Sequence, residues 1–335
     1  MRDLPQTTVF NPAVQNNYKV SIVLPGLSGA YAGVSNNGFA AQNVINLNGT
    51  QATLSLRELS ESVGDKNWLG ADIGFQALGV YVNKKDFSVH FRIRERFIFQ
   101  AQYPRELVDL VYKGNGHPDF LGESIDIAPE LAGLQYREYA LGGSYQINPK
   151  LRMGASLKYL QGVASMHTDN MQVNLTSENS GSYPTTISTQ GKIITSGVST
   201  FIDTEDVGDY LNTEGNAGFA IDIGAVYELT EEITLEAAAL NLGGIAWGNQ
   251  IEEYGFQEPS SSYTFSGLDA VSVFKEENGD EELDEAEASL EEVFEWKNDG
   301  NGTPGEDFFG TLPANLRLAG RYQMENGFQA GALIS

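Results

Sequence analysis

Polar and apolar residues alternate along several segments of the chain, and these segments come in pairs joined by very short polar turns. The turns lie at residues 83–86, 148–150, 230–232 and 325–327. Alternation with a period of two gives a β-strand one apolar face and one polar face. The pattern therefore predicts four antiparallel hairpins and an all-β fold.

Each of the four hairpins also carries a tyrosine on its apolar face, two or three residues before the turn. These residues are Tyr81, Tyr145, Tyr227 and Tyr322. Tyrosine favours a membrane–water interface, because its ring is apolar while its hydroxyl still needs a polar partner. We therefore expect the four tyrosines to form half of an interfacial aromatic girdle, with lipid against the apolar face of the sheet.

The connections between the hairpins are long, covering roughly residues 95–134, 161–216 and 243–313. Bacterial outer-membrane barrels combine short periplasmic turns with long extracellular loops. A compact soluble domain rarely contains three such long connections. This asymmetry favours a transmembrane antiparallel β-barrel in a bacterial outer membrane, in contact with the lipid bilayer and lipopolysaccharide. A secreted soluble β protein is the alternative.

Composition narrows this interpretation. The 335 residues carry a net charge of −25, which argues against nucleic acid as a partner because phosphate contacts need a basic face.

The first residues lack the apolar core of a signal peptide, and the last residues lie in the middle of an alternating strand, roughly the ninth. Single-chain bacterial barrels have even strand numbers. We therefore expect residues 1–335 to form one incomplete barrel domain.

Outside the hairpins, residues 1–16 are expected to form an irregular segment on the periplasmic side or in the lumen, followed by a first strand at 18–24. Helical spacing of apolar residues predicts short helices at 50–63 and 104–112, the second with a proline in its first turn.

Several short motifs resemble a Bacteroidota family of outer-membrane barrels of unknown function, related to the FadL and PorV type. They are Asp3-Leu4-Pro5-Gln6, Asn11-Pro12-Ala13, Leu24-Pro25-Gly26-Leu27 and Asn241-Leu242-Gly243-Gly244-Ile245. The resemblance implies a barrel of about fourteen strands, of which about nine are present, with the N-terminal segment in or beside the lumen. FadL relatives move long-chain fatty acids or other hydrophobic molecules, whereas PorV relatives serve a secretion apparatus. A hydrophobic small molecule and a secretion or surface protein are therefore the partners that it implies.

The polar faces of the strands carry charged residues that would line the lumen of such a barrel. They are His90, Arg92, Arg94, Glu138, Arg152, Lys158, Asp222, Glu236, Arg317 and Arg321. One interpretation is selectivity for an anionic or carboxylate-bearing solute, as charged rings provide in pores. The other, which we favour, is a lumen plug held by ion pairs across the barrel.

The acidic segment 275–307 is expected to be an insert in an extracellular loop, with a helix at 281–296. Its carboxylates at Asp280, Glu282, Asp284 and Asp299 are a weak candidate site for Ca²⁺, because calcium requires six to eight oxygen ligands. The spacing of an EF-hand is absent, and a solvated helix face is the ordinary interpretation.

The sequence offers little support for an enzyme or a cofactor. It has three histidines and no cysteine, and no serine signature accompanies the histidines. The leading hypothesis is a non-enzymatic barrel that allows passive transport of small, hydrophobic or carboxylate-bearing molecules. The alternative is a structural or secretion-associated barrel that docks a partner through its long loops.

Overall fold

The computed structural model describes residues 4–25, 29–48, 51–180, 184–198, 215–256, 262–265, 302–324 and 329–334. These residues form one antiparallel sheet of 16 strands and a separate two-stranded sheet of β3 (Ile45–Asn48) and β4 (Gln51–Leu54). The predicted all-β fold is confirmed. Within the described ranges, no helix is both long enough and apolar enough to span a membrane.

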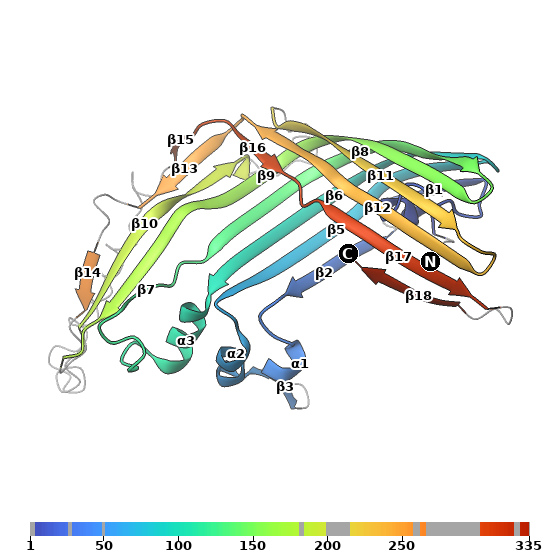
Figure 1. Cartoon of the computed structure of the whole chain (residues 1–335). Helices are drawn as coiled ribbons and strands as arrows, with labels where there is room; N and C mark the ends of the chain where they lie inside the picture. The colour runs from blue at the N-terminus through green and yellow to red at the C-terminus, as the bar shows by residue number, and fades with distance from the viewer. Residues whose placement is uncertain are drawn as a thin grey trace.

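Nine strands of this sheet lie side by side in a curved and twisted layer (Figure 1). Their order is β1 (Val20–Val23), β5 (Lys66–Asn83), β6 (Phe87–Pro104), β8 (Glu130–Asn148), β9 (Leu151–Ser177), β11 (Ala217–Glu228), β12 (Ile233–Trp247), β17 (Asn315–Gln323) and β18 (Gln329–Ile334). In the part of the chain that the structure describes, β18 does not pair with β1, so the sheet is not closed.

The remaining elements border this layer. The strands are β2 (Ala30–Asn36), β7 (Ser124–Asp126), β10 (Thr185–Ser196), β13 (Ile251–Gly255), β14 (Ser262–Phe265), β15 (Thr303–Pro304) and β16 (Phe308–Thr311). The helices are the 3₁₀ helix η1 (Pro5–Val9), α1 (Ala41–Val44), α2 (Leu56–Ser62) and α3 (Arg105–Lys113). Figure 1 shows α1, α2 and α3 together at the end of the sheet opposite the short turns. Strands β1 and β2 both pair with β5, one after the other along its edge.

The three short turns that the structure describes lie where the sequence predicts them, whereas residues 325–327 lie outside the described residues. The long connections are partly strand instead: β6 continues to Pro104, β9 to Ser177 and β12 to Trp247. The alternation fails there because a buried apolar cluster, including Tyr136, Leu160 and Trp247, occupies the inner side of these extensions. The inward-facing side chains are apolar in this region, while the outward-facing Glu95 and Arg137 are charged, so the pattern of one apolar and one polar face is lost.

The helix predicted at 104–112 is confirmed as α3, and the one predicted at 50–63 is confirmed only from Leu56 onward. Ser55 caps α2 by accepting a hydrogen bond from the Glu58 N–H at 3.4 Å, and the residues before it form β4. The two helices meet where the Ser60 hydroxyl donates to Asp109 Oδ1 at 2.5 Å. Burial raises the pKa of Asp109, but hydrogen bonds from Ser60 and Lys113 outweigh it and leave the pKa below its usual value.

The two faces of the sheet have opposite chemistry. The outer face exposes large apolar side chains, among them Leu157 (66% exposed) and Phe219 (72%). Phe75, Phe91 and Leu318 are exposed on the same face. The inner face, against which residues 4–17 lie, carries buried charged side chains. A soluble sheet normally buries its apolar face and exposes its polar one.

Three of the four predicted girdle tyrosines, Tyr145, Tyr227 and Tyr322, are exposed on the outer face beside the short turns. The prediction is wrong for Tyr81, which is 1% exposed and accepts a hydrogen bond from Gln76 Nε2 at 2.9 Å. The cause is a bulge in β5 between Gln76 and Leu78. One extra residue reverses the facing of every later side chain, so Tyr81 turns inward.

Candidate binding site on the inner face

The N-terminal segment, residues 4–17, is fixed against the inner face through Asn11. The Asn11 Nδ2 group donates to the carbonyl oxygens of Ala225 (3.1 Å) and Ala237 (3.4 Å), on β11 and β12. Two strand glycines make room for it, because a Cβ at Gly224 would collide with Asn11 Oδ1 and one at Gly154 would collide with the carbonyl oxygen of the next residue, Pro12. The absence of side chains at these positions creates the recess that holds the segment.

Next to this recess, four strands are joined by a network of buried charges. Arg92 on β6 contacts Glu138 on β8 (Nε–Oε1, 3.4 Å) and Asp222 on β11 (Nη2–Oδ2, 3.3 Å). Lys158 on β9 contacts the same two carboxylates at 3.3 and 2.8 Å. The side chains of Arg92, Glu138 and Asp222 are 0% exposed. Because each charge is paired, their burial is tolerated, and loss of any one of them would leave an uncompensated charge buried in the network.

The network also contacts the N-terminal segment. Arg92 Nη1 lies within hydrogen-bonding distance of Thr8 Oγ1 (3.4 Å) and of the Thr8 carbonyl oxygen (3.5 Å). The same nitrogen donates to His90 Nε2 at 3.0 Å, and this ring nitrogen also lies 3.0 Å from Ser156 Oγ. These contacts tie the segment to the centre of the inner face.

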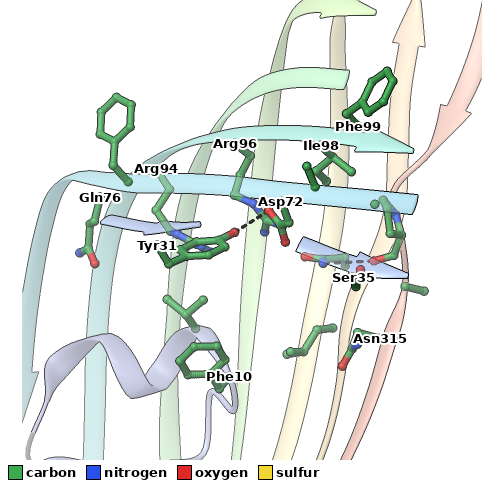
Figure 2. A pocket seen from close by; sticks show the side chains of 18 of the residues that line it. Phe10, Tyr31, Ser35, Asp72, Gln76, Arg94, Arg96, Ile98, Phe99 and Asn315 are labelled. Carbon is green, nitrogen blue, oxygen red and sulfur yellow. Dashed lines mark hydrogen bonds and ion pairs between the residues drawn. The ribbon is translucent and has the colours of Figure 1, made fainter. Parts of the chain in front are cut away.

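A cavity of about 550 Å³ lies beyond the network, between β2, β5, β6, β17 and the N-terminal segment (Figure 2). The ring of Tyr31 forms one wall, with the guanidinium carbons of Arg94 and Arg96 each 5.7 Å from its centre. Asp72 accepts a hydrogen bond from the Tyr31 hydroxyl at 2.8 Å and pairs with Arg96 at 2.8 and 3.0 Å. Gly74 lets the ring lie flat, because a Cβ there would be 2.7 Å from it.

A third guanidinium reaches the cavity from the opposite strand. Arg317 lies 4.7 Å from the centre of the Phe10 ring, and its Nε donates to Asn315 Oδ1 at 2.9 Å. Among the described residues, no carboxylate lies within 4.0 Å of Arg317. Four cationic side chains line the cavity, from Arg94, Arg96, Lys158 and Arg317, against the single carboxylate of Asp72. The cavity is therefore suited to an anion.

Comparison with known families assigns the chain to one of them. Residues 12–335 match a family of unknown function, DUF5723. The chain belongs to this family. Comparisons with curated proteins and with solved structures find no match. The matched range contains every strand that the structure describes in the sheet.

All ten residues that the sequence assigns to a lumen lie on the inner face of the DUF5723 sheet. Arg92, Arg94, Glu138, Lys158 and Asp222 come together in the charge network, with Arg94 at 3.8 Å from Glu138, and His90 adjoins it. Arg317 belongs to the cavity of Figure 2 and, together with Glu236 and Arg321, to a second cavity beside the N-terminal segment. Arg152 lies apart, near the short turns, where it donates to the Lys85 carbonyl oxygen at 3.0 Å.

The proposed calcium ligands Asp280, Glu282, Asp284 and Asp299 lie outside the described residues. Within the described residues, no group of three histidine, aspartate or glutamate side chains is placed to hold a metal ion.

The sequence pattern misses part of the DUF5723 site. Arg96 continues the alternation of Arg92 and Arg94 on the same face of β6, although the sequence predicts that this strand ends at residue 94. The signal for Arg96 is therefore present in the sequence. Tyr31 and Asp72 meet only because β2 pairs with β5, which no local pattern indicates.

Proposed function

We propose that this chain forms a β-barrel in a bacterial outer membrane and provides a passive route for small molecules that are hydrophobic or carry a carboxylate. The inverted sheet is the observation that carries this proposal. Large apolar side chains such as Leu157 and Phe219 face outward, while fully buried, paired charges such as Arg92 and Asp222 face inward. A contiguous exposed apolar face indicates contact with a membrane or a partner protein. A membrane barrel has this arrangement of faces.

Aromatic residues on the outer face support the membrane position. Tyr145, next to the short turns, begins the apolar band on β8, and a second aromatic row of Tyr139, Tyr159 and Phe219 follows further along β8, β9 and β11. The ring centres of this row are 6.0 and 5.7 Å apart. Directly beyond it, the outward-facing side chains of Glu95 and Arg137 form an ion pair that is itself buried. Aromatic rows that border an apolar band are typical of barrel interfaces with the bilayer.

A closed barrel requires backbone partners for both edges of the described sheet. The outer edges of β18 and of the β1–β2 pair would leave backbone N–H and C=O groups unpaired in lipid, where they cost several kcal/mol each. Further strands between these edges, as in a FadL-type barrel, would pair them.

The inner face supports a narrow and selective route. The N-terminal segment occupies part of the interior, held by Asn11 and by the Arg92–Thr8 contact. The cavity of Figure 2 lies beside it and offers both cationic groups and aromatic walls. A solute with an apolar body and a carboxylate would find favourable contacts there.

Reconstitution tests this proposal. The full-length protein should require detergent for solubility, insert into liposomes and raise the flux of small carboxylates above that of empty liposomes. A monodisperse protein in buffer without detergent would show that it is a soluble β protein. Stable insertion with the flux of empty liposomes, together with a co-purifying protein, would favour the secretion-associated barrel instead.

A further inference from the structure

The cavity of Figure 2 combines arginine side chains with aromatic rings and with buried polar atoms that lack partners among the described residues. We propose that it binds a small aromatic carboxylate that carries a hydroxyl or amino group. This inference rests on the proposed function only for the route by which such a ligand arrives, because binding itself is measured on the solubilised protein.

Arg317 is the group that recognises the carboxylate. Arg96 is engaged by both oxygens of Asp72, and Arg94 lies 3.8 Å from Glu138. Arg317 donates through its Nε to Asn315, and no described carboxylate lies within 4.0 Å of it. Its two terminal nitrogens can therefore donate to a ligand carboxylate in the bidentate geometry that guanidinium groups favour.

The walls select an aromatic ring over a long alkyl chain. Phe10 and Tyr31 contribute ring faces, and Figure 2 shows Phe10 on the N-terminal segment below the strand wall that carries Tyr31. Between them the cavity is lined by uncharged polar side chains: Gln6, Ser35, Gln76, Gln100, Asn241 and Asn315. A long alkyl chain would desolvate these groups without replacing their hydrogen bonds, which is costly. A compact ring with polar substituents pairs with both kinds of wall.

Two unpartnered atoms indicate the substituents. Gln6 Oε1 is a buried acceptor and Arg96 Nε a buried donor, and neither has a hydrogen-bond partner among the described residues. Both residues line the cavity. Buried polar atoms without a partner are uncommon in native structures, and a ligand or water that supplies the missing bond explains them. A ligand hydroxyl or amino group would donate to Gln6, and a ligand oxygen would accept from Arg96.

The test uses three probes on the full chain in detergent: 4-hydroxyphenylacetate, the uncharged 4-hydroxyphenylethanol, and decanoate. Calorimetry measures binding, and a change in tryptophan fluorescence that is absent in Trp68→Phe reports occupancy, because Trp68 lines the cavity. We expect the aromatic acid to bind at least about tenfold more tightly than either of the other probes, as loss of a charge-assisted hydrogen bond implies. Arg317→Gln should weaken the aromatic acid by about tenfold or more.

Arg321→Gln is the matched control, because Arg321 lies on the same face of β17 but does not line this cavity. It should leave the affinity unchanged, and both variants should keep the thermal midpoint of the parent, since both arginines lie outside the buried network around Glu138 and Asp222. Absence of binding by the aromatic acid, equal binding of the uncharged probe, tighter binding of decanoate, or an equal loss in Arg321→Gln would each overturn the proposal. Flux in liposomes without binding would refute only the ligand assignment, whereas binding without flux would refute only the transport role.

Discussion

The attachment of the N-terminal segment to the inner face can be weakened at one side chain. Asn11 is 4% exposed and makes three hydrogen bonds: two from its Nδ2 to the carbonyls of Ala225 and Ala237, and one that its Oδ1 accepts from the Ala13 N–H. Asn11→Ala removes all three and leaves the rest of the segment unchanged. The bond to Ala13 lies within the segment, so only the two bonds to the sheet attach it. At about 0.5–1.5 kcal/mol net for each buried hydrogen bond, these two should stabilise the docked segment by about 1–3 kcal/mol.

That free energy determines how much of the protein has the segment undocked. Since about 1.4 kcal/mol corresponds to a factor of ten, the undocked segment should become roughly 5–150-fold more populated in Asn11→Ala. Native-state hydrogen exchange measures this population, because the Val14 N–H is bonded to the Asn11 carbonyl at 3.1 Å only while the segment keeps its fold. Exchange at Val14 should accelerate by the same factor, while exchange in β11 and β12 should stay as in the parent.

Thr7→Ala provides the control within the same segment. The Thr7 hydroxyl donates to the Leu4 carbonyl at 2.9 Å, a local contact that does not involve the sheet. Exchange at Val14 in this variant should remain within about threefold of the parent value, since exposed local bonds contribute a few tenths of a kcal/mol. Unchanged protection of Val14 in Asn11→Ala would contradict this anchoring role of Asn11. Equal acceleration of exchange in β11 would also contradict it, because the segment would then not undock independently of the sheet.

Three further predictions concern the charge network, the outer face and the helices. Arg92→Met leaves buried carboxylates short of a partner and should destabilise the fold by about 3–5 kcal/mol in denaturant titrations, whereas Arg321→Met should cost well under half of that. If the outer face meets lipid, Leu157→Arg on that face should destabilise folding into vesicles by about 2–4 kcal/mol. Gln172→Arg, near the far end of β9, is the control. A similar cost there would contradict a membrane boundary between these two positions. The lowered pKa of Asp109 means that its stabilising contribution is complete above the unfolded pKa of about 4 and is lost as pH falls through the folded value. The α3 amide protection factors should therefore stay constant above about pH 5 and fall below it, and Asp109→Asn should remove that dependence.

The faces of the strands can be predicted from the sequence because each strand side chain obeys a period of two. This period alone places Arg92, Glu138 and Asp222 on one face. It cannot show that they touch, since Arg92 and Asp222 are separated by 130 positions and meet only through the order of the strands. The network and the cavity are therefore properties of the topology and not of any local motif.

The two wrong predictions from the sequence, for Tyr81 and for the strand extensions, each have an identifiable cause. The pattern misplaces Tyr81 because a bulge adds one residue without leaving a composition signal in Gln76-Ala77-Leu78. It assigns the strand extensions to loops because Tyr136 and Trp247 make the inner face apolar where polar residues are expected. In both cases tertiary packing overrides the pattern that a single strand would show.

The anchoring of Asn11 has a consequence for assembly. Its two acceptors on β11 and β12 lie 214 and 226 positions further along the chain, and the recess exists only once Gly154 and Gly224 stand in neighbouring strands. Contacts across such separations form late in folding, because the intervening chain must first be ordered. A stretch that is synthesised before every strand must therefore wait, without its final partners, until β9, β11 and β12 have paired.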